Sequence, residues 1–293
     1  MSGFNFNNGI VKIVDCKYGT FMHYVNDSPI GECLDVYGEW GEKEIELISQ
    51  YLQPNHNVID IGANIGTHTV FFSKRCNQGL IYSIEPQFYI FQILNANVSL
   101  NGAFNTKLYN SPVSNEFESV KLLHFPPFDN KKINYGEFKI HNVENGLETR
   151  CIKLDDHFSN IQFIKLDVEG HELSCLKSGE KLIESDKPMM YIEFNNKQGN
   201  EELIEFLWSH GYKCYWHVTS KFSYPNFRNQ KVNIWIDDQK IAPNLPLVEK
   251  FFEGNIFCVH ESVSLEVPLE KISDSKDNYI SYLLRTKQIT NVK

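Results

Sequence analysis

Residues 58–70 read VIDIGANIGTHTV, and this stretch decides how the rest of the chain is interpreted. An apolar run around Asp60 is followed by Gly62 and Gly66, and a helical pattern begins after the second glycine. The pattern predicts a strand, a tight turn and a helix start. Glycine suits the turn because the backbone can bend sharply and approach a ligand with no Cβ in the way. The free amide groups at the helix N-terminus are expected to face the same space.

The spacing of the turn, D-x-G-x-N-x-G, narrows the choice of ligand. In the G-x-G-x-x-G turn of dinucleotide sites the middle glycine lets backbone amides touch a pyrophosphate, whereas Asn64 holds that position here. The next apolar strand, residues 80–84, ends at Glu85, where a carboxylate is placed to accept hydrogen bonds from both hydroxyls of a ribose. These features together predict S-adenosylmethionine as the cofactor. An ordinary βαβ turn with no ligand is the alternative.

Strand and helix patterns alternate along most of the chain, which predicts a parallel, doubly wound α/β sheet. Ligands of such sheets bind beyond the carboxyl ends of the strands, and Gly62, Glu85 and Asp167 all follow strand ends. The expected strands are 58–61, 80–84, 106–109, 163–166 and 189–194, and the expected helices are 41–52, one ending near 76, 88–102, 169–179 and 200–209.

Length and composition fit one large α/β domain with decorations. The chain has 293 residues, of which 42% are hydrophobic and 13% aromatic. No apolar run approaches the roughly 20 residues that span a bilayer, and the start, MSGFNFNNGIVKIVDCK, lacks the basic and apolar regions of a secretory signal. We therefore expect a cytoplasmic protein with no membrane span.

Cysteine and charge content exclude several classes of protein. The seven cysteines are odd in number and form no C-x-x-C pair, which argues against a disulfide framework or a zinc knuckle and favours buried apolar residues in a reducing compartment. Against 37 Asp and Glu stand 28 Lys and Arg, so the net charge is −9, with no basic cluster. A nucleic-acid partner is therefore not expected.

Three further segments surround the main domain. We expect short strands over residues 10–36 that form a β-hairpin or lid, alternating patterns typical of an antiparallel insertion, and a C-terminal tail or peripheral helix. The predicted division is 1–40 for the hairpin or lid, 41–260 for the main domain with 112–160 as its β insertion, and 261–293 for the tail or helix. Aromatic residues crowd positions 212–235, where core packing explains most of them and a substrate cleft is the alternative.

With these residues in view, the chain resembles the FkbM-type methyltransferases, a family of class I S-adenosylmethionine-dependent enzymes. The resemblance spans roughly residues 18–260. It is carried by VIDIGANIGTHTV, YSIEP followed by NANVSLNG, CIKLDDH, FIKLDVEGHELSCLKSG and YIEFN. It implies a Rossmann-like, seven-stranded sheet with six parallel strands and one antiparallel strand. The implied reaction is methyl transfer to a hydroxyl of a sugar, glycan or secondary metabolite.

The resemblance also carries over individual residues. The first cofactor motif of the family is matched by Asp60, Gly62, Asn64 and Gly66, the ribose acid by Glu85, and the acidic motif after a later strand by Asp167 and Glu169. Position alone suggests that Asn110 or Ser111, after the strand at 106–109, holds the adenine edge, and a plain turn before Pro112 is the alternative.

A base must remove the proton of the acceptor hydroxyl, which contributes on the order of 10²–10⁴ in rate. The turn DVEGHE offers Asp167, Glu169 and His171, with Glu169 or His171 as first choice, while Asp167 is also suited to hold the ammonium tail of the cofactor. Glu193 and His217 are further candidates for the base. A magnesium ion on Asp167, Glu169 and Glu172 is an alternative, but we expect no metal.

Two other functions are compatible with parts of the sequence. A nicotinamide-dependent oxidoreductase would share the sheet, and Tyr135 and Lys139 form the Y-x-x-x-K pair that short-chain dehydrogenases place on one helix face. Gly136 and a two-residue alternation favour a strand there, so we discount the pair. A non-catalytic protein that binds the cofactor is the second alternative. Aromatic residues and the acidic charge favour a neutral or cationic hydroxylated small molecule or glycan as the acceptor.

Overall fold

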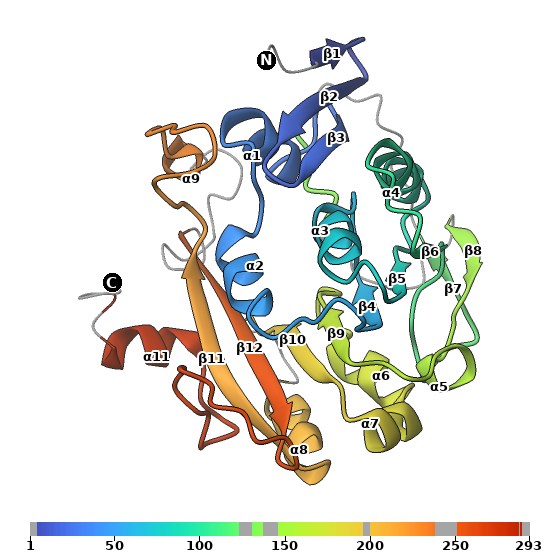
Figure 1. Cartoon of the computed structure of the whole chain (residues 1–293), viewed down its shortest axis with the longest axis vertical. Coiled ribbons are helices and arrows are strands. Elements are labelled where there is room, and N and C mark those ends of the chain that lie inside the picture. The colour runs from blue at the N-terminus through green and yellow to red at the C-terminus, as the bar shows by residue number, and fades with distance from the viewer. Residues whose placement is uncertain are drawn as a thin grey trace.

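The computed structural model describes residues 5–122, 131–136, 146–195, 200–237, 251–286 and 288. A seven-stranded sheet in the order β11-β12-β10-β9-β4-β5-β6 forms its centre (Figure 1). Neighbouring strands run parallel except β12, which is antiparallel to both β10 and β11. The strands are β4 (Val58–Ile61), β5 (Ile81–Ile84), β6 (Thr106–Tyr109), β9 (Phe163–Leu166), β10 (Met189–Glu193), β11 (Tyr212–Ser220) and β12 (Phe252–His260). This is the Rossmann-like class I methyltransferase sheet that the resemblance implies, with six parallel strands and one antiparallel strand.

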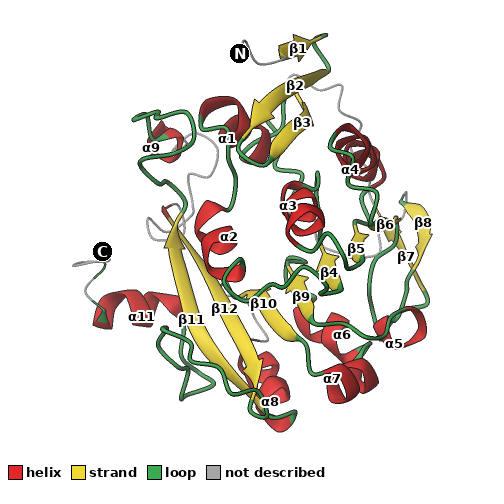
Figure 2. Ribbon diagram, in the orientation of Figure 1, coloured by secondary structure: helices red, strands yellow, loops and turns green. Residues whose placement is uncertain are grey.

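Helices cover both faces of the sheet, as Figure 2 shows in red around the yellow strands. One face carries α2 (Glu42–Ile48), α3 (Thr67–Arg75) and α4 (Phe88–Leu100), and the other carries α5 (Leu154–His157), α6 (Glu172–Lys177), α7 (Glu180–Asp186) and α8 (Asn200–Ser209). The central strands β4 and β9 are buried at every residue, as expected of parallel strands that are covered on both faces.

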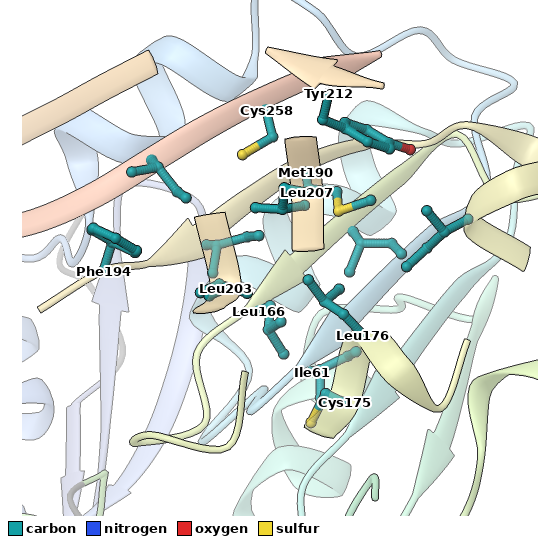
Figure 3. Packing of buried hydrophobic residues seen from close by; sticks show 14 of the residues in the cluster. Ile61, Leu166, Cys175, Leu176, Met190, Phe194, Leu203, Leu207, Tyr212 and Cys258 are labelled. Atoms are coloured by element: carbon teal, nitrogen blue, oxygen red, sulfur yellow. The ribbon is translucent and has the colours of Figure 1, made fainter. Parts of the chain in front are cut away.

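The sheet separates two apolar cores. On the side of α6 and α8, Leu166 and Met190 pack with Leu176, Leu203 and Leu207, as the close view in Figure 3 shows. On the other side, residues of α2 and α3 pack against alternate strand positions, among them Val58, Phe163 and Tyr191. Alternate residues of one strand thus enter opposite cores, because side chains of a strand alternate between the faces of the sheet.

The N-terminal segment forms a separate small antiparallel sheet of β1 (Asn5–Asn7), β2 (Val11–Cys16) and β3 (Gly19–Tyr24). Backbone groups of β3 bond the side chains of Asn97 and Asn101, which fastens this sheet to α4 and the end of that helix. The expectation of strands up to residue 36 is wrong at its end, where α1 (Ile30–Val36) is a helix. Its buried Ile30, Cys33 and Leu34 have helical spacing.

Two other expectations are corrected. The helix after β9 begins at Glu172 and not at residue 169, because Glu169 and Gly170 have φ values of 57° and 99°, which no right-handed helix contains. Between this helix and β10 lies a second helix, α7, for which no element was expected. At the C-terminal end, α11 (Tyr279–Arg285) packs on β11 with Tyr279 and Leu283 buried.

The β insertion and the burial of most cysteines agree with the expectations made from the sequence. Strands β7 (Ser119–Leu122) and β8 (Leu147–Arg150) pair antiparallel within the segment 112–160. All seven cysteines are free, and all but Cys151 are buried. Among the described residues, no helix is long and apolar enough to cross a membrane. The exact division into lid, main domain and tail stays a prediction.

Candidate active site

A cavity of ≈ 480 Å³ lies at the carboxyl ends of the central parallel strands. Its walls include residues that follow β4, β5 and β9, the last residue of β10 and, because β12 runs the other way, the first residues of β12. The sequence-predicted residues among them are Gly62, Asn64, Glu85, Asp167, Glu169 and Glu193. Parallel strands that end at one edge therefore bring together side chains more than 100 residues apart.

The turn after β4 is held by close backbone contacts. Gly62 has φ +78°, and a Cβ on it would lie 1.8 Å from the carbonyl oxygen of Asp167. Gly66 has φ +90°, and a Cβ there would lie 2.6 Å from Cδ1 of Leu94 on α4. The two glycines thus let the turn pack against the loop after β9 and against α4. Asp60 is fully buried below the turn, where it accepts a 2.6 Å hydrogen bond from Oγ1 of Thr69. Neither Asp60 nor Gly66 lines the cavity.

Glu85 is a buried carboxyl group that bonds directly to the backbone of this turn. Its Oε2 accepts the backbone N–H of Asn64 at 3.0 Å, and its Oε1 accepts the backbone N–H of Gln87 at 2.7 Å. Burial raises the pKa of Glu85 to about 7, against the lowering effect of these two hydrogen bonds. A carboxylate has about four acceptor positions, so two positions remain for a ligand.

Asn110 and Ser111 do not line the cavity. The side-chain amide of Asn110 donates to the backbone carbonyls of Glu85 and Pro86 at 2.8 and 3.1 Å. Asn110 therefore fixes the path of the chain beside Glu85. A contact between adenine and Asn110 or Ser111 stays a prediction without support from this geometry.

Three acidic side chains meet across the ends of β9 and β10. One carboxylate oxygen from each of Asp167, Glu169 and Glu193 lies within 4.8 Å of the others. The alternative metal ligand Glu172 is turned aside, because its Oε1 accepts the backbone N–H of Gly170 at 3.0 Å. Among the residues that the structure describes, the acidic group at this edge thus contains Glu193 in place of Glu172.

A buried lysine compensates part of this negative charge. Lys165, on β9, is 4% exposed, and its Nζ lies 3.2 Å from Oδ2 of Asp167. Burial alone would lower the pKa of Lys165, but the carboxylates of Asp167, Asp60 and Glu44 outweigh it and raise this pKa. Lys165 therefore stays charged among Asp60 on β4, Asp167 in the loop after β9 and Glu44 on α2.

Neither histidine considered as a base lines the cavity. His171 is the residue that precedes α6, and its backbone carbonyl accepts the N–H of Cys175. Nδ1 of His217 lies 2.7 Å from the hydroxyl of Tyr191, and burial lowers the pKa of His217 to about 4. The geometry therefore favours the carboxyl groups over both histidines.

Two residues that line the cavity, Glu253 and His68, and one buried beside them, Glu44, were not anticipated from the sequence. Glu253, the second residue of β12, has its pKa raised to about 7 by burial and then by the charge of Glu44. Burial likewise raises the pKa of Glu44 to about 7, and His68, 3.1 Å from Glu44, has its pKa lowered to about 4 by burial. Glu44 carried a signal, because it lies one helical turn before Ile48 on the buried face of α2.

Part of the cavity lining is aromatic. Trp40 and Trp235 lie with ring centroids 6.4 Å apart, and Phe252 and Tyr279 also line the cavity. Of the aromatic residues at 212–235, for which a substrate cleft was the alternative to core packing, Trp235 on α9 (Ile234–Asp237) lines the cavity. Tyr135 lines the cavity from a loop and donates to Oδ1 of Asn26 at 3.2 Å. Its proposed partner Lys139 lies outside the described residues.

The strand order defines the class of the fold, a class I methyltransferase fold, and the cavity lies at the switch point of its sheet. Residues 60–214 match the family model described as the methyltransferase FkbM domain, which covers more than half of the chain. The chain belongs to the FkbM methyltransferase family.

Two curated proteins that the chain resembles are named as methyltransferases. The chain is 21% identical to "Methyltransferase 1" of Beauveria bassiana (strain ARSEF 2860) over 141 residues, 41% of this chain and 57% of that protein. It is 27% identical to "Methyltransferase sdnD" of Sordaria araneosa over 125 residues, 42% of this chain and 48% of that protein. The chain spans about half the length of these curated relatives.

Among solved structures, methyltransferase FkbM from Methylobacillus flagellatus KT is 17% identical, with 76% of this chain and 48% of that chain covered and a TM-score of 0.45. TYW2 of M. jannaschii in complex with AdoMet is 13% identical, with 87% of both chains covered and a TM-score of 0.43. Both TM-scores lie below 0.5, and the strand order of the chain itself defines its fold.

Proposed function

We propose that this protein transfers a methyl group from S-adenosylmethionine to a hydroxyl of a small-molecule or glycan acceptor. The observation that carries the proposal is the position of Glu85, a buried carboxyl group with spare acceptor positions, beside the glycine turn in one cavity. Family membership supports the same reaction. Attack by a hydroxyl, and not by another nucleophile, is the finer part of this proposal.

The residues present fit the cofactor. The two remaining acceptor positions of Glu85 suit the two hydroxyls of a ribose. Asp167, on the other side of Gly62, suits the ammonium group of the amino-acid tail, since Lys165 already orients it. When bound, S-adenosylmethionine supplies a methyl group activated by a positive sulfur. In this arrangement Asp60 and Gly66 shape the turn, and Gly62, Asn64 and Glu85 contact the ligand.

Methyl transfer breaks a carbon–sulfur bond, forms a carbon–oxygen bond and releases the hydroxyl proton. We assign the removal of this proton to Glu169, which lines the cavity beside Asp167. Glu253 is a second candidate, because its raised pKa of about 7 lies near neutral pH, where a general base works best. His171 is not proposed, since it does not line the cavity. Holding acceptor and cofactor in line contributes about 7–11 kcal/mol in favourable cases.

Calorimetry with S-adenosylhomocysteine and with NADH tests the proposal. We expect saturable binding of S-adenosylhomocysteine to one site and none of NADH. Binding of NADH alone would replace the proposal by the oxidoreductase alternative. If the protein binds S-adenosylmethionine and transfers its labelled methyl group to no hydroxylated acceptor in a broad panel, the non-catalytic alternative is correct.

A further inference from the structure

Among the described residues, the side chain of Glu85 has only neutral hydrogen-bond partners. It is 6% exposed, and its two oxygens accept one backbone N–H each, from Asn64 and from Gln87. No lysine, arginine or histidine in the described part of the chain forms an ion pair with it. A buried carboxylate without an opposite charge is costly, so burial favours the protonated form of Glu85 in the protein without cofactor. The protonated form keeps both backbone bonds, because a carboxyl group still accepts at each oxygen.

The charged groups around Glu85 act in the same direction as its burial. Burial, and after it the charges of Asp60 on β4 and Asp167 after β9, raise the pKa of Glu85 to about 7 against the lowering effect of the two backbone N–H groups. The ammonium of Lys165 pairs with Asp167 at 3.2 Å. His68, on α3, adds no positive charge near neutral pH, since burial lowers its pKa to about 4. Without cofactor, about half of the protein molecules therefore carry a proton on Glu85 near pH 7.

A bound ribose changes the hydrogen-bond balance of this group, which lines the cavity. An ionised carboxylate offers about four acceptor positions, whereas a protonated carboxyl gives up one of them to its own O–H. The two backbone N–H groups and the two hydroxyls of the ribose together supply four donors, which the ionised form satisfies completely. Hydrogen bonds donated to the charged form of an acid stabilise that form. The ribose therefore favours ionised Glu85 over the protonated form.

Resting on the proposed function, we propose that binding of S-adenosylmethionine or S-adenosylhomocysteine displaces a proton from Glu85 into the solvent. The O–H bond of the carboxyl group breaks, its electron pair stays on the carboxylate, and the proton passes to water or buffer. The bound proton keeps an unpaired charge out of the buried site before the cofactor arrives. Its release leaves a carboxylate that is surrounded by donors. The affinity for the cofactor therefore rises with pH, because the protein molecules that still hold the proton must lose it before they bind.

Calorimetry of S-adenosylhomocysteine with the full chain at several pH values tests this proposal. The enthalpy of binding is measured in buffers with different enthalpies of ionisation, and the slope between the two quantities counts the protons released. We expect release of about half a proton per site near pH 7, and roughly tenfold tighter binding at about pH 8 than at about pH 6. Glu85→Gln has no proton to release and should lose both effects. Glu184→Gln, which removes an exposed acid on α7, should keep them.

A second measurement needs no variant and decides the question if Glu85→Gln fails to fold. Infrared difference spectra of the wild type should show that the C=O band of a protonated carboxyl group disappears as S-adenosylhomocysteine binds.

The outcomes separate this inference from the proposed function. Saturable binding of S-adenosylhomocysteine with an affinity independent of pH and no proton release would overturn the inference and leave the proposed function in place. Equal proton release in the wild type and in Glu85→Gln would assign the proton to another group and overturn it as well. If S-adenosylhomocysteine binds at no pH, the proposed function itself is wrong, and the inference falls with it.

Discussion

Replacement of Glu85 by glutamine removes one charge from the cavity and nothing from its shape. Each carboxylate oxygen of Glu85 accepts a backbone N–H, from Asn64 at 3.0 Å and from Gln87 at 2.7 Å. Whichever oxygen becomes an NH₂ group therefore faces a backbone donor. A buried donor left without an acceptor costs about 1–3 kcal/mol, so Glu85→Gln should lower the free energy of unfolding by about that amount.

The same substitution should weaken cofactor binding. The carboxylate is expected to accept both ribose hydroxyls, and a hydrogen bond to a charged group contributes about 1.5–3 kcal/mol. Loss of one such bond corresponds to roughly 10- to 150-fold weaker binding of S-adenosylhomocysteine. The measurement is calorimetry at a pH well above the raised pKa of about 7, where wild-type Glu85 is ionised. Glu184→Gln, which removes an exposed acid on α7, is the matched control, and thermal melts establish that each variant is folded. Wild-type affinity in folded Glu85→Gln would refute the role of this carboxylate.

Further predictions concern the base, the buried acids and the turn. Glu169→Gln should reduce the rate of methyl transfer by about 10²–10⁴-fold, with little change in the affinity for S-adenosylhomocysteine. His171→Ala should keep the wild-type rate. Equal rates in the two variants would contradict the assignment of Glu169 as the base. Three carboxyl groups have pKa values raised from 4.5 to about 7 in the folded protein, so between these values each binds more protons in the folded state than in the unfolded chain and lowers the free energy of unfolding by about 1–3 kcal/mol as pH rises. His68 and His217, whose pKa values burial lowers to about 4, act in the opposite direction over much of the same range, so denaturant melts of the wild type are compared with those of Glu253→Gln. The loss of stability with rising pH should be smaller in the variant, and an equal loss would contradict the assignment of the raised pKa values to these carboxyl groups. These groups are Glu44, Glu85 and Glu253. Gly62→Ala should lower the free energy of unfolding by at least about 1–3 kcal/mol, because its Cβ would lie 1.8 Å from the carbonyl oxygen of Asp167; an unchanged melting temperature would show that the loop after β9 can move away.

The parts of the site that lie next to one another in sequence were predictable. Asp60, Gly62 and Gly66 belong to one strand, turn and helix start, and local patterns of apolar residues and glycines report such a unit directly. Glu85 was found because a strand end is a local signal and the carboxyl ends of parallel strands share an edge. The number of strands in the sheet and its single antiparallel strand followed from the family resemblance, whereas their order is known from the structure.

Other parts depend on contacts between distant segments. Glu253 enters the cavity only because β12 runs antiparallel to β10, and no pattern near residue 253 reports that direction. Trp235 and Glu44 arrive from elements almost 200 residues apart. The helix α6 starts late because the backbone at Glu169 and Gly170 is left-handed. This conformation ends the loop after β9, which packs against Gly62, before the helix begins.

A crystal structure of the protein with S-adenosylhomocysteine tests the central claim most directly. We expect the ligand in the cavity beyond β4 and β5, with both ribose hydroxyls donating to the carboxylate of Glu85 and the amino-acid tail beside Gly62 and Asp167. A ligand bound elsewhere, or a ribose that makes no contact with Glu85, would contradict the claim.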